Sequence, residues 1–188
     1  MVKKIVQIGD PVLEQKCDKV DPKDPKIQEL INDLIDTCKE KEDITAGLSA
    51  PQVGEKLRIC ICRRTDLEEG SEKPLPSETL WEVLINPTVK NSSKKTSTYW
   101  EGCLSIGEGP EGLYGPVARP EEVTVEFQTR TGDKKTLQCS GFFSHVVQHE
   151  LDHLEGVLFL KYISDPDTIW KGKELDKYYS KHGEYPPV

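Results

Sequence analysis

The segment that most constrains this chain is His149-Glu150-Leu151-Asp152-His153, in which two histidines stand four residues apart. Side chains at positions i and i+4 of an α-helix lie one above the other on the same face, so both imidazoles can reach one metal ion. Glu150, beside the first histidine, can direct a carboxylate at a metal-bound water molecule. The spacing therefore predicts a helix over residues 142–154 that carries two metal ligands and a general base.

Two histidines do not complete a catalytic metal site, which needs a third protein ligand and an open position for water or substrate. Extending the motif downstream as H-E-x-x-H-x-x-G-x-x-H places Gly156 correctly, but Phe159 stands where the third histidine should be. Among the carboxylates downstream, Asp152 and Glu155 lie on other faces of the helix. Glu174 keeps a ligand set of the thermolysin type open.

Upstream, Cys103 is the candidate for the third ligand. It lies in Glu101-Gly102-Cys103-Leu104-Ser105, directly after a predicted strand, and Gly102 permits close approach of the backbone to another group. A thiolate is a strong, soft ligand for Fe(II), Zn, Co or Ni. A lone cysteine is more often a small buried hydrophobic residue, so Cys103 by itself leaves both interpretations open.

Length and charge limit the remaining classes of protein. A chain of 188 residues predicts one domain, and its net charge of −8 lacks the broad basic surface of a nucleic-acid binder. No run of eighteen apolar residues predicts a membrane span, and the N-terminal residues resemble neither a signal peptide nor a transit peptide. We therefore expect a cytoplasmic location. The six cysteines are expected to be free thiols, with Cys60 and Cys62 packed on one face of a strand.

Hydrophobic periodicity and turn residues predict an α+β domain without an internal boundary. Asp24-Pro25 begins an amphipathic helix, with Asp24 as its N-cap and an apolar stripe directed at the core. Phe142, Val146, Leu151 and Leu154 are expected to face the core from the motif-bearing helix. The other expected elements are a short helix or strand at 1–8, strands at 57–63, 81–85 and 94–100 with a break at Asn86-Pro87, an exposed loop at 64–79, a glycine-rich loop at 107–116, a hairpin of 123–130 with 134–140, and a last helix from 167 to about 181.

Three segments, taken together and in order, resemble the peptide deformylase family. Its G-x-G-L-x-A-x-Q, E-G-C-L-S and Q-H-E-x-D-H-L-x-G segments correspond to residues 45–52, 101–105 and 148–156. The second and third segments are complete. The first departs from the pattern at Thr45, which replaces a glycine, and at Ser49, which replaces the more usual alanine. The resemblance extends over residues 5–165.

The resemblance implies the fold, with small antiparallel or mixed β-sheets packed around a central helix that bears the H-E-x-x-H motif. The whole chain, 1–188, would be a single catalytic domain of the peptide deformylase type, with 165–188 as a partly helical C-terminal extension. The implied reaction is metal-dependent hydrolysis of the formyl group from the N-terminal formyl-methionine of new polypeptides, with release of formate. The implied partners are formyl-methionyl nascent peptides, and contact with the ribosome stays open. Neither nucleic-acid reading nor membrane binding is implied.

Residue roles carry over by position. Cys103, His149 and His153 would hold one divalent metal, which in this family is most often Fe(II) in cells, with Zn, Ni or Co accepted. The catalytic roles fall to Glu150, as general base and later proton donor, and to two groups that would stabilise the developing oxyanion, the Gln52 amide and the backbone N–H of Leu104. Gly47 and Gly102 would let the backbone approach the substrate.

Several neighbouring residues have two possible roles. Glu101 is expected to orient a ligand or the loop that carries Cys103. His145, one turn before His149, can line a substrate pocket or be a core histidine with a backbone partner, and we favour the second role. Val146 and Tyr99 can line an apolar pocket or belong to the core. The loop at 107–115 can shape substrate access or be a surface insertion.

Two other functions compete with the deformylase interpretation. A metallopeptidase of the H-E-x-x-H type would cleave internal peptide bonds and would use a third ligand other than Cys103. A non-catalytic protein of this fold would keep the site as a structural metal centre or a peptide-binding module. Replacing Cys103 tests the first alternative, and replacing Glu150 by glutamine tests the second.

Overall fold

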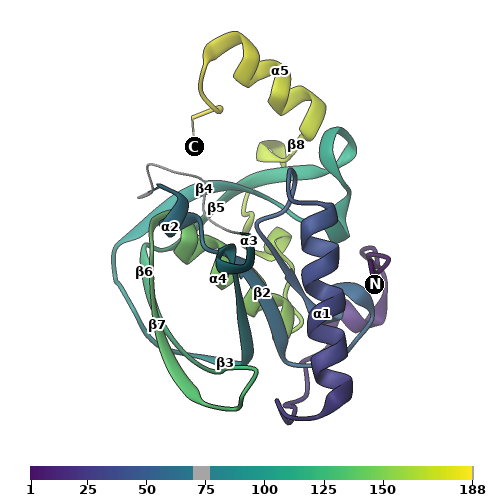
Figure 1. The fold of residues 1–188 in the computed structure, drawn as a ribbon. Coiled ribbons are helices and arrows are strands. Elements are labelled where there is room, and N and C mark those ends of the chain that lie inside the picture. Colours follow the sequence, from purple (N-terminus) through teal and green to yellow (C-terminus); the bar gives the residue numbers. More distant parts are fainter. Residues whose placement is uncertain (70–76, 188) are drawn as a thin grey trace.

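The computed structural model describes residues 1–69 and 77–187 as an α+β domain in which two antiparallel sheets surround one helix (Figure 1). The helices are α1 (Pro25–Glu40), α2 (Thr65–Glu69), α3 (Ser77–Leu80), α4 (Gly141–Leu154) and α5 (Gly172–His182). Short 3₁₀ helices span Pro11–Glu14, Ala50–Val53, Leu104–Ile106, Gly109–Glu111, Phe159–Tyr162 and Pro166–Thr168. None of the described helices combines the length and apolar character that crossing a bilayer requires.

The larger sheet has five strands in the order β1-β2-β3-β6-β7, and the smaller sheet has three in the order β4-β5-β8. Every pair of neighbouring strands is antiparallel. The strands of the larger sheet are β1 (Gly47–Ser49), β2 (Ile59–Arg63), β3 (Trp81–Ser92), β6 (Glu122–Gln128) and β7 (Lys134–Ser140). The strands of the smaller sheet are β4 (Thr96–Gly102), β5 (Leu113–Pro120) and β8 (Trp170–Lys171). The predicted fold class is therefore confirmed.

Helices cover both faces of the larger sheet. Successive side chains of a strand point to opposite faces, so one strand can contribute to the core on each side. On β2, Ile59 and Ile61 join the core cluster of α1, whereas Cys60 and Cys62 join the cluster of α4. All four side chains have no exposed surface. All six cysteines are free thiols, as expected. The sheet thus holds α4 firmly in the interior.

Helix α1 begins as predicted, with the Asp24 side chain accepting a hydrogen bond from the Lys26 N–H. The β6–β7 hairpin and the bounds of α4 also agree with the predictions. Phe142 is an exception. It is 37% exposed, and the adjacent Phe143 takes the core position instead.

Several predicted elements were wrong. Residues 1–8 form neither helix nor strand; they are held by backbone bonds such as Val6 N–H to Gln52 O. The predicted break at Asn86 lies within β3 and is a register irregularity, since Asn86 has a φ of 52° and its side-chain amide donates to Val20 O. The predicted loop at 64–79 contains α2 and α3, and its residues 70–76 lie outside the described part.

Two further predictions failed near the C-terminal half. The glycine-rich loop ends earlier than expected, because Leu113 begins β5. The last helix begins at Gly172 rather than at 167, since residues 166–168 form a 3₁₀ turn and Trp170–Lys171 pair with β5 as strand β8. The residues of β5 that pair with β8 are far from it in sequence, so local patterns did not indicate strand β8.

Candidate metal centre and pocket

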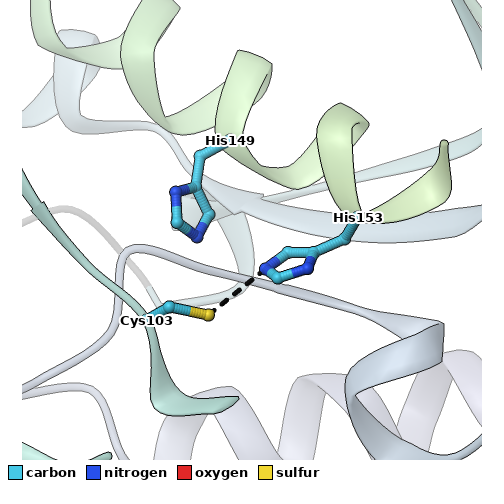
Figure 2. A group of neighbouring side chains, drawn as sticks. All are labelled: Cys103, His149 and His153. Carbon is cyan, nitrogen blue, oxygen red and sulfur yellow. Dashed lines mark hydrogen bonds between the residues drawn. The ribbon is translucent and has the colours of Figure 1, made fainter. Parts of the chain in front are cut away.

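The two motif histidines and Cys103 converge on one point (Figure 2). Helix α4 presents His149 and His153 on the same face, and Cys103 follows the end of β4 directly. One ligand atom from each residue lies within 4.8 Å of the others, and Cys103 Sγ is 3.3 Å from His153 Nε2. One sulfur and two imidazole nitrogens are a donor set for a single divalent metal with a position left open.

Other carboxylates do not join this group. Asp152 pairs with Arg119, and Glu155 pairs with Lys16 and Arg58. Glu174 lies on α5 and pairs with Lys177. In the described part of the chain, the only cluster of three metal-ligating side chains is Cys103, His149 and His153. The thermolysin-type ligand set therefore has no support in the structure.

Glu101 fixes the orientation of the His149 ring through a contact with its Nδ1 atom. Its Oε2 lies 2.9 Å from His149 Nδ1, and Arg119 forms a forked bond to the same carboxylate. Burial opposes ionisation, but the hydrogen bonds from Arg119, His145 and His149 keep the pKa of Glu101 far below its usual value. An ionised Glu101 that accepts from Nδ1–H leaves Nε2 of His149 as the free ligand atom. The predicted orienting role of Glu101 agrees with this geometry.

The electrostatics of the ligand cluster suit a cation. Burial and the positive charges of His149 and Arg119 lower the pKa of His153 well below its usual value, so its imidazole is neutral and can act as a ligand. At His149 burial has the same tendency, yet the Cys103 and Glu101 groups hold its pKa well above the usual value. Without a metal, Cys103 and Glu101 thus favour the protonated form of His149, and this proton would have to leave Nε2 when a metal binds there.

Glu150 is buried between two residues of the first motif segment. Ser49 Oγ lies 2.6 Å from Glu150 Oε2 and 2.9 Å from the Glu150 carbonyl oxygen. Burial raises the pKa of Glu150 to about 7, against the opposing effects of His149 and Ser49. At Gly47 a Cβ atom would lie 2.6 Å from Glu150 Oε1, so only glycine leaves room for this carboxylate.

Gln52 and Leu104 lie beside Cys103. The Gln52 side-chain oxygen accepts from the Ser49 N–H at 2.8 Å, which directs its amide nitrogen to within 3.4 Å of Cys103 Sγ. Leu104 follows Cys103 and lines the same pocket. Gly102 also lines the pocket, and the group that approaches its backbone is the Tyr114 ring, 2.3 Å from where a Cβ atom would stand.

The pocket beside this cluster is a cavity of about 160 Å³ with mostly apolar walls. Phe142, His145 and Val146 of α4 form one wall, whereas Trp100 and Tyr114 of the smaller sheet belong to the other. Val146 combines the two roles considered for it, because it lines the pocket and also belongs to the buried core cluster of α4. Tyr99 is not in the lining; its ring contacts Phe142 and His145 instead.

His145 combines the two roles considered for it. Its Nε2 lies 3.1 Å from the Ser97 carbonyl oxygen, and its Nδ1 lies 3.3 Å from Glu101 Oε1. It is 2% exposed, so it is a core histidine with a backbone partner, as favoured, and it also contributes to the pocket wall.

Arg119 is the functional residue that the sequence did not reveal. It is 4% exposed, and its guanidinium joins Glu101 to Asp152. A signal was present in β5, where Arg119 stands two residues after Val117 and therefore on the same, inward face. A charged residue at an inward position is buried only when it is paired.

An antiparallel α+β fold with an H-E-x-x-H helix, a cysteine beside its two histidines and an adjoining apolar pocket defines a metal-dependent hydrolase. The family model described as Polypeptide deformylase matches residues 2–168. The chain therefore belongs to the peptide deformylase family.

Individual relatives agree with this membership. The chain is 39% identical over 164 residues to the peptide deformylase of Rhizobium meliloti, which covers 87% of this chain and 86% of the relative. It is also 39% identical over 160 residues to the peptide deformylase of Dictyoglomus thermophilum, a match that covers 85% of this chain and 92% of the relative. Among solved structures, peptide deformylase from Ehrlichia chaffeensis in complex with actinonin has a TM-score of 0.75 at 28% identity, covering 97% and 99%. The structure of a plant peptide deformylase has a TM-score of 0.74 at 30% identity, and the match covers 98% of this chain and 95% of the plant protein.

Proposed function

We propose that this chain hydrolyses the formyl group from the N-terminal formyl-methionine of newly made polypeptides and releases formate. The observation that carries the proposal is the convergence of three groups on one apolar pocket: the Cys103, His149 and His153 cluster, the Glu150 carboxylate and the Gln52 amide. Membership of the peptide deformylase family supports it. The chain would act as a single catalytic domain over 1–188.

Cys103, His149 and His153 would hold one divalent metal. When bound, the metal would supply Lewis-acid polarisation of the formyl group and a water molecule of lowered pKa. A thiolate with two imidazoles suits Fe(II), Zn, Ni or Co, and we propose Fe(II) as the metal in cells. Glu101 supports the site by fixing the orientation of the His149 ring.

The chain's own residues perform the proton transfers and the charge stabilisation. Glu150 takes a proton from the attacking water and later gives it to the leaving amine, a task suited to a buried carboxylate whose pKa is about 7. The Gln52 amide and the backbone N–H of Leu104 donate to the oxygen that becomes negative. Losing one such donor typically costs about 3–4 kcal/mol of transition-state stabilisation.

The pocket supports an unbranched apolar side chain next to the formyl group. Phe142, Val146 and Trp100 provide apolar and aromatic surface, against which a thioether packs well. Gly47 and Gly102 line this pocket, and each lacks a side chain so that the Glu150 carboxylate and the Tyr114 ring can pack against its backbone. We propose that these two glycines also contact the substrate main chain. We propose formyl-methionyl nascent peptides as the partners and the cytoplasm as the place of action, with any contact to the ribosome left to experiment.

The test is formate release from formyl-Met-Ala-Ser by anaerobically purified, Fe(II)-loaded protein, with Glu150→Gln measured alongside. The parent should release formate, and the variant should keep its metal but lose turnover, because glutamine cannot accept the proton. Metal-loaded parent that releases no formate would exclude this substrate. Equal turnover by Glu150→Gln would exclude the base assignment.

The same assay separates the two competing functions. Cys103→Ser should lose both metal and formate release, whereas a metallopeptidase with another third ligand would keep its metal. Cleavage of an unformylated peptide at an internal bond would favour that metallopeptidase. A binding module would retain the peptide with unchanged affinity in Glu150→Gln and release no formate in either protein.

A further inference from the structure

The C-terminal segment, residues 170–187, packs beside the pocket although it lies beyond the residues that the family model matches. In Figure 1 its strand β8 and helix α5 lie at the top of the molecule, next to β4 and β5. Strand β8 pairs with the start of β5, with Trp170 opposite Tyr114 of the pocket lining. The segment therefore begins directly against the pocket wall.

The same segment holds the loop at 107–112. The Gly172 N–H donates to Gly112 O at 2.9 Å, and the Lys171 ammonium lies 2.9 Å from a Glu111 carboxylate oxygen. At Gly172 a Cβ atom would lie only 2.3 Å from Gly109 O. Helix α5 thus starts in close contact with the backbone of this loop.

The loop depends on outside contacts because it contains three glycines. Gly107 and Gly109 have φ values of 117° and 51°, and both line the pocket. Glycine loses more conformational freedom on ordering than any other residue. Apart from bonds within the loop and a partly exposed ion pair between Lys41 and Glu108, the hydrogen bonds and ion pairs described for it come from the C-terminal segment.

A second group of contacts joins the segment to Trp100. The Trp170 ring lies edge-on to the Trp100 ring with centroids 6.1 Å apart, and it also has an edge-on contact with the Tyr178 ring at 5.6 Å. The Trp100 indole N–H donates to the carbonyl oxygen of Pro186, a buried residue, at 3.2 Å. Trp100 is therefore held by both ends of the C-terminal segment.

We propose that the C-terminal segment is a positioning element for substrate binding: it orders the loop at 107–112 and the Trp100 side chain, and so preforms the outer wall of the pocket. The role rests on the proposed function. Preforming a wall lowers the entropy that binding must otherwise overcome. It leaves the metal ligands and Glu150 untouched, so its loss should weaken substrate binding without slowing the chemical step.

The test uses Gly172→Ala in the full chain. Alanine is a better helix former than glycine, so α5 itself is not weakened. Its Cβ must instead push α5 away from Gly109. We expect the KM for formyl-Met-Ala-Ser to rise at least about fivefold, with kcat within about twofold and bound metal unchanged. Hydrogen exchange at residues 107–112 should accelerate, while exchange in α4 stays the same.

Trp170→Ala provides an independent variant, because it removes the ring that contacts both Trp100 and Tyr178 without adding an atom. Its KM should rise in the same way. Ser180→Ala, an exposed change on the same helix, is the matched control and should behave as the parent. An unchanged KM in both Gly172→Ala and Trp170→Ala would overturn the proposal. Faster hydrogen exchange at residues 107–112 without a change in KM would also overturn it. A parent that releases no formate would instead contradict the proposed function.

Discussion

Ser49 donates a 2.6 Å hydrogen bond to Glu150 Oε2, while its own backbone N–H holds the side-chain oxygen of Gln52 at 2.8 Å. One buried residue therefore fixes both the proposed base and a proposed oxyanion donor. The hydroxyl occupies one carboxylate oxygen of Glu150. The other oxygen is left on the side of Gly47, in the pocket lining.

Ser49→Ala should lower kcat for formyl-Met-Ala-Ser by about tenfold, because a hydrogen bond to a charged group contributes roughly 1.5 kcal/mol and each 1.4 kcal/mol is a factor of ten. KM and metal content should stay unchanged. Alanine is the more usual residue of the family pattern here, so the variant should fold. Ser144→Ala is the control: it removes another buried hydroxyl, one of α4 itself that donates to Pro120 O and accepts from Gln148, and it should keep the parental kcat.

Glu101→Gln should weaken metal binding by about 10- to 100-fold, the range typical when the partner of a ligating histidine is changed. Glutamine can still accept one hydrogen bond from His149 Nδ1 but has no charge with which to favour a cation nearby. Competition with a metal chelator measures the affinity. Asp152→Asn breaks the other ion pair of Arg119 without touching His149, and it should destabilise the fold while leaving metal affinity unchanged. Equal metal loss in both variants would contradict a specific role for Glu101.

Local patterns predicted the parts of the molecule that local chemistry determines. The i, i+4 spacing predicted α4, and the E-G-C-L-S segment indicated Cys103 as the third member of the cluster. The apolar stripe after Asp24 predicted α1. The two helices depend on residues within a few positions of one another, so a single sequence contains their signals completely. Cys103 lies 50 residues from His153, and the resemblance to a family pattern, not local spacing, joined it to the histidines.

The features that the sequence did not reveal depend on distant partners. Strand β8 forms because the edge of β5 lies beside Trp170, more than fifty residues away in sequence. Asn86 continues β3 because its side chain bonds Val20, a residue far upstream. Arg119 is buried because Glu101 and Asp152 surround it in the folded chain. Periodicity reports which face is buried but not which partner buries it.

Acid should weaken one surface contact in a predictable window. This contact is the ion pair between Asp66 and Arg64. Burial tends to raise the pKa of Asp66, but the forked bond from Arg64 outweighs burial and lowers this pKa below its usual value. A carboxylate whose folded pKa is depressed stabilises the fold above its unfolded pKa of about 3.9, and this contribution disappears as the pH falls through the folded value.

Asp66→Asn should therefore lower the free energy of unfolding at pH 7 by at most about 1 kcal/mol, since the pair is partly exposed and screened. The difference between parent and variant should narrow as the pH falls below about 4. Urea unfolding at a series of pH values measures it. A difference that stays constant down to pH 2 would show that Asp66 acts through packing and not through its charge.

Removing the metal should expose one cysteine to chemical labelling. Burial raises the pKa of Cys17 to about 11 and that of Cys139 to about 12, so both thiols are protonated and unreactive at neutral pH. Cys103 lines the pocket, and a bound metal would occupy its sulfur. Metal-free protein should therefore react with iodoacetamide first at Cys103, and loading with Zn should slow that reaction by at least about tenfold.

Peptide mass spectrometry after timed labelling identifies the modified residue. The Cys103→Ser protein is the control, and it should show no fast-labelling site with or without Zn. Labelling of Cys103 at the same rate in metal-free and metal-loaded protein would mean that its sulfur does not hold the metal. In that case His149 and His153 would need a different third ligand, and the metallopeptidase alternative would again have to be tested.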